Sequence, residues 1–89
     1  MKMRNEDLKK ITEINQYLFD PPVSFKLYDY AIVYLQDALN VLSAYIDAED
    51  TIVYLQHLLE QLQNKTMPQE ELRGALKEAG KKISRLTSQ

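Results

Sequence analysis

His57 is the single histidine of the chain, and a histidine side chain can serve in catalysis or in metal binding. A helical metal site usually places two histidines four residues apart. A di-metal site in a helical bundle needs Glu-x-x-His motifs on two helices and inward glutamates on two others. The chain has no second histidine and no cysteine. The glutamates that fall mainly on predicted solvent faces are Glu13, Glu49, Glu60, Glu70, Glu71 and Glu78.

Other signatures of catalysis are missing from the sequence as well. It contains no glycine-rich phosphate loop and no G-x-S-x-G motif. We therefore expect no catalytic residue, no metal site, no bound cofactor and no enzymatic activity. The formal net charge of −2 argues against nucleic-acid binding, because a phosphate backbone is usually matched by a basic surface.

The basic residues are unevenly spread along the chain. Lys77, Lys81, Lys82 and Arg85 crowd the C-terminal end. One interpretation is a solvated helix end whose cations complement the helix dipole. The other is an electrostatic contact with an anionic membrane surface or with an acidic patch of a protein.

Six tyrosines and no tryptophan supply most of the aromatic content. One interpretation is that the tyrosine rings border a small core while the hydroxyl groups stay in contact with water. The other concerns Tyr30 and Val33, which lie off the main apolar rows. These two residues could form part of an exposed patch for a partner or for a weak dimer.

Apolar residues recur at helical spacing in four segments, which predict helices over about 6–18, 25–46, 48–64 and 68–86. We expect N-caps at Asn5, Ser24, Asp47 and either Thr66 or Met67. The connections between the helices are short, which favours antiparallel neighbours. With 89 residues there is room for one domain. The sequence thus predicts an all-α, single-domain, antiparallel up-down four-helix bundle.

Three positions make this prediction more specific. Leu8 in the first segment and Ile46 at the end of the second continue the apolar rows and are expected to face inward. Gly80 lies in the interior of the last segment, where glycine disfavours a helix by about 1 kcal/mol relative to alanine. We expect the last helix to be frayed or bent near this glycine.

The letters IVYLQ occur twice, at residues 32–36 and 52–56. On one unbroken helix, a shift of this length at about 100° per residue would place the two copies on opposite faces. A helix break between them is therefore expected. The spacing is too short for known helical-pair repeats, so we interpret the repeat as the packing pattern of two helices that share one core.

Nothing in the sequence marks the chain for export or for membrane insertion. The N-terminal stretch MKMRNEDLKK is charged and lacks the apolar region of a signal peptide. No stretch approaches the roughly 18 apolar residues of a membrane span. The absence of cysteine fits a reducing compartment. We expect a cytoplasmic protein without a transmembrane segment, with peripheral membrane association left open.

The order of these features resembles that of the small bacteriocin immunity proteins, the enterocin A immunity-like group that acts against pediocin-like bacteriocins. The resemblance covers about residues 6–83. It depends on the polar turn from Asp47 to Asp50, on the link Asn64-Lys65-Thr66-Met67-Pro68, and on the following Leu72 and Leu76. It implies an antiparallel four-helix bundle that acts inside the producing cell.

The resemblance also implies a function and a partner. Such a protein protects its cell from a pore-forming peptide by engaging the membrane receptor, a mannose-type sugar-uptake permease, once the bacteriocin has bound. Because the C-terminal half would set specificity, the implied contact residues are Lys65, Met67, Lys77, Lys81, Lys82 and Arg85. The alternative function is a small helical regulator or adaptor, for instance phage-encoded, that binds a partner helix or dimerises through Tyr30 and Val33.

Overall fold

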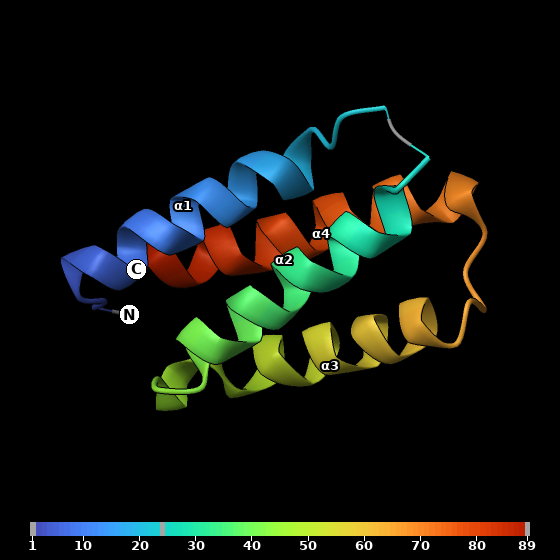
Figure 1. The fold of residues 1–89 in the computed structure, drawn as a ribbon. Helices are drawn as coiled ribbons and strands as arrows, with labels where there is room; N and C mark the ends of the chain where they lie inside the picture. Colours follow the sequence, from blue (N-terminus) through green and yellow to red (C-terminus); the bar gives the residue numbers. More distant parts are fainter. Residues whose placement is uncertain (1, 24, 89) are drawn as a thin grey trace.

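Four α-helices and one short 3-10 helix make up the computed structural model, which describes residues 2–23 and 25–88. The elements are α1 (Asn5–Phe19), α2 (Leu27–Leu42), η1 (Ile46–Ala48), α3 (Glu49–Gln63) and α4 (Gln69–Thr87). Successive helices run in opposite directions, so the two ends of the chain lie at the same end of the bundle (Figure 1). The predicted antiparallel up-down four-helix bundle is confirmed.

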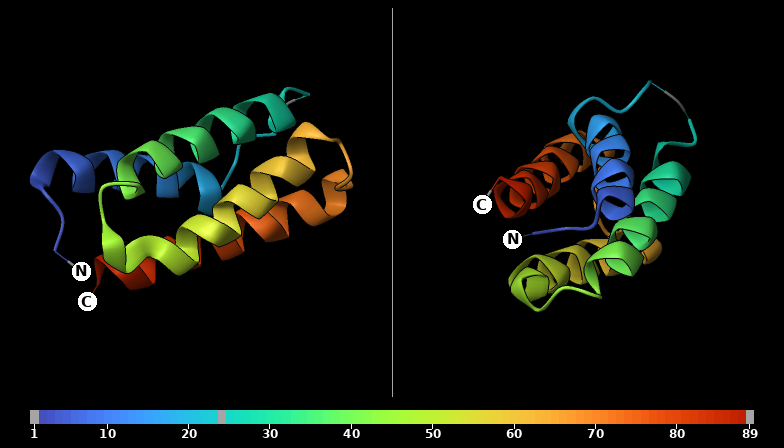
Figure 2. Two further views of the ribbon diagram at one scale, coloured as in Figure 1. Left: turned by 90° about the horizontal axis from the view of Figure 1, so that it is seen from below. Right: turned by 90° about the vertical axis from the view of Figure 1, so that its left-hand side faces the viewer.

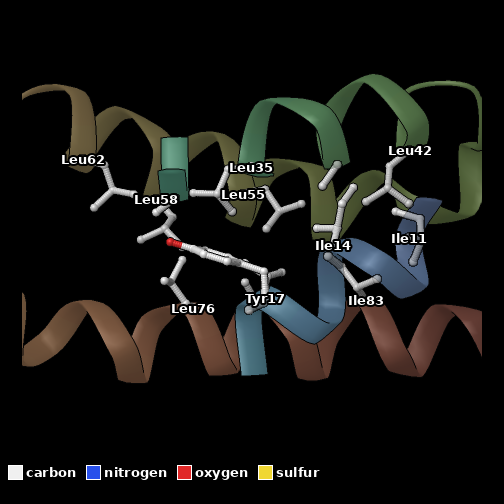
Figure 3. Close-up of a cluster of buried hydrophobic side chains, with 14 of the residues drawn as sticks. Ile11, Ile14, Tyr17, Leu35, Leu42, Leu55, Leu58, Leu62, Leu76 and Ile83 are labelled. Atoms are coloured by element: carbon white, nitrogen blue, oxygen red, sulfur yellow. The ribbon is translucent and has the colours of Figure 1, made fainter. Parts of the chain in front are cut away.

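Each helix packs against two neighbours. Helix α1 packs against α2 and α4, and α3 packs against α2 and α4, so the helices form a closed ring around the core (Figure 2). All four helices contribute inward side chains, which meet along the bundle axis (Figure 3). The largest fully buried side chains are Ile11, Leu18, Leu27, Leu35, Leu42, Leu55, Leu62, Leu72, Leu76 and Ile83.

The second helix is shorter than predicted, since it ends at Leu42 rather than near residue 46. The Ser43 hydroxyl donates to the Asn40 carbonyl at 2.9 Å and so satisfies a free acceptor of the last turn. Tyr45 is extended and begins the turn into η1. Ile46, which was expected to face inward, is 90% exposed. The apolar spacing continues past Leu42, but the helix does not.

The predictions of side-chain N-caps were wrong for the three helices where they can be compared. Asn5 is the first residue of α1, Asp47 lies inside η1, and the N-cap position of α4 is Pro68. None of the helix starts has a side-chain cap hydrogen bond among the described residues. The predicted cap Ser24 lies outside the described residues. Acidic residues do occupy the first turns of these helices, where they suit the helix dipole.

Helix α4 is continuous through Gly80 as far as Thr87, so the predicted fraying near this glycine is wrong. Gly80 is buried, and a Cβ atom added there would lie 3.0 Å from the ring of Phe19. The missing side chain lets the aromatic ring of α1 approach the backbone of α4 closely. Leu8, also expected to face inward, is exposed.

The two copies of the repeat lie at equivalent places in the α2 and α3 hairpin. From Ala31 to Leu42 and from Thr51 to Leu62, each residue has the same class of burial as the residue twenty positions away. The packing interpretation therefore accounts for the buried positions of the repeat. It does not account for Val33 and Val53, which are identical in the two copies although both are exposed.

A polar cluster ties the start of α1 to the turn after α2. The Tyr45 hydroxyl donates to Asp7 Oδ2 and accepts from the backbone N–H of Arg4 at 3.2 Å. Arg4 Nε also donates to Asp7 Oδ2 at 3.2 Å. The hydrogen bond from Tyr45, followed by that from Arg4, holds the pKa of the Asp7 carboxyl below its usual range, against the opposing effect of burial.

This cluster predicts a pH-dependent contribution to stability. A carboxyl with a lowered pKa stabilises the fold fully above its unfolded value, about 3.9, and loses that contribution as the pH falls through the folded value. We expect Tyr45→Phe to be less stable than wild type at neutral pH. The difference should shrink when urea unfolding is repeated at pH values below about 4.

Tyr28→Phe is the matched control, because the Tyr28 hydroxyl donates to the backbone carbonyl of Met67 at 2.8 Å and not to a carboxylate. Its difference from wild type should stay constant over the same pH range. A pH-independent loss in Tyr45→Phe would contradict the assignment of this contribution to Asp7.

Candidate functional site

The eight residues predicted to contact a partner lie in three separate places. Lys65 and Met67 belong to the link between α3 and α4, a second group lies along α4, and Tyr30 and Val33 lie on α2. Helix α4 has 19 residues, which corresponds to a length of about 28 Å. The link and the basic C-terminal end are therefore at opposite ends of the bundle (Figure 1). They do not form one compact site.

The link reverses the chain through a Schellman motif. The N–H of Thr66 donates to the Gln61 carbonyl at 3.0 Å, and the N–H of Lys65 donates to the Leu62 carbonyl at 3.2 Å. Lys65 has a positive φ of 55°, a conformation usually taken by glycine at this position. The result is an exposed lysine side chain held on a fixed turn.

Next to this turn is a surface hollow of about 400 Å³ lined by Phe25, Tyr28, Asp29, Lys65 and Met67. Met67 packs partly against the core, and its carbonyl accepts the hydrogen bond from Tyr28. Phe25 is 94% exposed and was not singled out from the sequence. Its position beside the proline link, outside any helical row, was the one signal that could have marked it.

Three basic residues of α4 form a ridge, which we call the basic ridge: Lys77, Lys81 and Arg85. They are spaced four residues apart, so they share one side of the helix, and all three are exposed. Among the described residues, none of the three forms an ion pair with a carboxylate. Repulsion between like charges at this spacing costs roughly a few tenths of a kcal/mol, and the helix dipole offsets it only at Arg85, in the last turn of α4.

Lys82 does not belong to the basic ridge. Its Nζ atom lies 5.0 Å from the centre of the Tyr54 ring, in a cation-π contact between α4 and α3. Burial raises the pKa of the Tyr54 phenol. This lysine therefore has a structural contact that the other three basic residues lack.

The tyrosines divide between the two interpretations given for them. Tyr17 and Tyr34 stack with ring centres 4.1 Å apart, between α1 and α2, and burial raises the pKa of Tyr17. Tyr28 and Tyr45 hold hydroxyl hydrogen bonds at the edge of the core. Tyr30 is different, since 48% of it is exposed.

Val33 is 52% exposed on α2 and has an equivalent in α3, Val53, which is 60% exposed. Sequence reasoning singled out Val33 but missed Val53, although the repeat relates the two positions. The structure places Tyr30 and Val33 on the surface of one helix, and it adds Val53 on the neighbouring helix.

Charge is divided sharply between the two halves of the bundle. Residues 27–63, which include α2 and α3, contain six carboxylates and no lysine or arginine. The rest of the chain contains all eleven lysines and arginines and seven carboxylates. Since α2 pairs with α3 and α1 pairs with α4, the mildly acidic protein has one acidic pair of helices without lysine or arginine and one pair of mixed charge, whose cations are concentrated in α4.

The described residues offer little that resembles an active site. A second hollow, of about 380 Å³ between α1 and α2, is lined by groups of both signs, including Lys10, Glu13 and Asp37. His57 is exposed on α3. No group of three His, Cys, Asp or Glu side chains is arranged as metal ligands in residues 2–23 and 25–88. Over the same residues, no helix has the length and apolar character that a membrane span requires.

Comparison of the chain with known protein families, curated sequences and solved structures found no match in any of the three. The resemblance to the bacteriocin immunity group therefore depends on the turn, link and helix residues quoted for it.

Proposed function

We propose that the protein is a non-enzymatic immunity protein. It would protect its cell from a pore-forming peptide by binding the membrane receptor that the peptide occupies, from the cytosolic side. The observation that carries this proposal is the basic ridge of Lys77, Lys81 and Arg85. These are three exposed cations on one side of α4, without ion pairs among the described residues.

The basic ridge suits a partner embedded in an anionic lipid surface. Each lysine or arginine near such a surface contributes about 1 kcal/mol of attraction. Contributions of this size concentrate a protein beside a membrane receptor without anchoring it permanently. The acidic helices α2 and α3 belong to the other side of the bundle, so attraction and repulsion together would orient the molecule.

The experiment that tests this proposal is a protection assay. The protein is expressed in a bacteriocin-sensitive strain that carries the sugar-uptake permease, and killing by a panel of pore-forming peptides is compared with an empty-vector control. We expect survival to increase for at least one peptide. Stable expression, verified by immunoblot, with no protection against a broad panel would contradict the proposal.

The second candidate function is a helical regulator or adaptor that binds a partner helix. A different observation favours it: Val33 and Val53 are exposed aliphatic side chains on two neighbouring helices. The test compares cells that have the protein with cells that lack it. If a soluble partner is no longer regulated in cells that lack the protein, while their sensitivity to pore-forming peptides is unchanged, this function is favoured over immunity.

A further inference from the structure

The outer side of α2 and α3 carries six aliphatic residues, which we call the α2–α3 face: Ile32, Val33, Leu39, Ile52, Val53 and Leu59. The valines are more than half exposed, and the other four are partly buried against the core. Each residue of the face in α2 has an identical residue twenty positions later in α3.

Helix geometry places the partly buried residues along the seam between the two helices. On α2, Tyr34 stacks on Tyr17 of α1. Ile32 and Leu39 lie on the opposite side of the helix from Tyr34, at about 100° per residue, and so on the side away from α1. This side of α2 faces α3.

The same argument holds for α3. The Tyr54 ring lies under Lys82 of α4. Ile52 and Leu59 lie on the side of α3 away from Tyr54, and therefore toward α2. The two helices thus contribute equivalent aliphatic residues to one seam. Val33 on α2 and Val53 on α3 project outward on either side of it.

Among the described residues, Val33 and Val53 belong neither to the buried core nor to the partly buried side chains packed against it. Valine is a poorer helix former than leucine or alanine, because its branched side chain loses rotamer freedom in a helix. An outward valine at both Val33 and Val53 therefore disfavours each helix slightly, while more than half of each valine stays exposed to water. A partner that covers both valines would supply the missing burial.

The negative charge around the α2–α3 face restricts which kind of partner can bind there. The carboxylates of Asp29, Glu49 and Glu60 are exposed on α2 and α3, and residues 27–63 contain no lysine or arginine. A second copy docking through the same face would oppose carboxylates to carboxylates. An anionic lipid surface would be repelled for the same reason.

We propose that the α2–α3 face binds a cationic amphipathic helix of a peptide or protein. The apolar side of that helix would lie along the seam and cover Val33 and Val53, while its lysines or arginines would reach the surrounding carboxylates. The proposal goes beyond the immunity function and does not depend on it, because it concerns the opposite pair of helices from the basic ridge.

The test uses a fluorescently labelled helical peptide of about 18 leucine and lysine residues, about five turns, with all leucines on one side. An isomer of the same composition with its leucines scattered over all sides is the peptide control. Binding is measured by fluorescence anisotropy at about 0.15 M salt, where long-range attraction is screened. We expect the amphipathic peptide to bind at least about tenfold more tightly than the isomer.

Val33→Lys combined with Val53→Lys should weaken binding of the amphipathic peptide at least about tenfold, because it removes the covered apolar surface and adds repulsion. The matched control is Thr12→Lys combined with Gln16→Lys, which makes the same charge change at exposed positions of α1. We expect a change of less than about threefold for this control. Thermal unfolding by circular dichroism verifies that both double variants fold.

Three results would overturn the proposal. One is equal binding of the two peptides, or no binding of either. Another is an equal loss in both double variants, which would mean attraction by net charge alone. The last is a dimer of the wild-type protein in analytical ultracentrifugation that Val33→Lys with Val53→Lys dissociates, since a second copy would then cover the face.

Discussion

Leu55→Ala is expected to lower the free energy of unfolding by about 2–5 kcal/mol, the range for deleting a fully buried leucine side chain. Leu55 is fully buried in α3, where it meets inward side chains of the other helices (Figure 3). Native domains have a total stability of only about 5–15 kcal/mol, so this loss is a large fraction of the whole. The variant should therefore unfold at a clearly lower urea concentration than wild type when unfolding is followed by far-UV circular dichroism.

Leu39→Ala is the matched control, because it removes the same atoms from a leucine at the α2–α3 seam that is only partly buried. We expect a clearly smaller loss than for Leu55→Ala, since less apolar surface returns to water and no closed cavity is left. Equal losses in the two variants would contradict the burial seen here. They would mean that the seam is covered in solution.

The existence and direction of the four helices could be predicted from the sequence because each helix is strongly amphipathic and the connections are short. The end of α2 could not be predicted from periodicity. Tyr45 and Ile46 continue the apolar rows, but the Tyr45 hydroxyl hydrogen-bonds to Asp7 and Arg4, far away in the sequence. A helix end fixed by such a tertiary contact leaves no local pattern.

The effect of Gly80 on α4 also could not be predicted from the sequence. Local propensity marks an interior glycine as a weak point. Whether the glycine weakens the helix or admits a neighbour depends on which side chain faces it across the bundle. Here the neighbour is the ring of Phe19, sixty-one positions earlier in the chain.

The candidate surfaces were predictable in part. The basic residues of α4 and the pair Tyr30 and Val33 were singled out by type and by their departure from the apolar rows. The separate role of Lys82 was not, because its contact with Tyr54 depends on how α3 and α4 are aligned. The lack of lysine and arginine in residues 27–63 can be read from the sequence. That this segment forms one acidic side of the bundle could not be predicted, because it depends on the pairing of α2 with α3.

Charge reversal on the basic ridge is the change expected to affect the proposed function most. Lys77→Glu, Lys81→Glu and Arg85→Glu together should abolish protection in the killing assay, because they replace about 3 kcal/mol of attraction to an anionic surface with repulsion. The fold should survive, since the three side chains are exposed and form no ion pairs among the described residues. The main structural penalty is a glutamate in the last turn of α4, about 0.3–1 kcal/mol.

The matched control reverses three exposed lysines near the start of the chain, Lys2→Glu, Lys9→Glu and Lys10→Glu. It makes the same change in net charge at the same end of the bundle, where the start of α1 lies beside the end of α4 (Figure 2), but it leaves the basic ridge intact. We expect this variant to protect as the wild type does. Equal loss of protection in both triple variants would assign the effect to net charge, and full protection by the ridge variant would remove the ridge from the contact surface. Because either result requires a wild-type protein that protects, the assay separates an error about the contact surface from an error about the function itself.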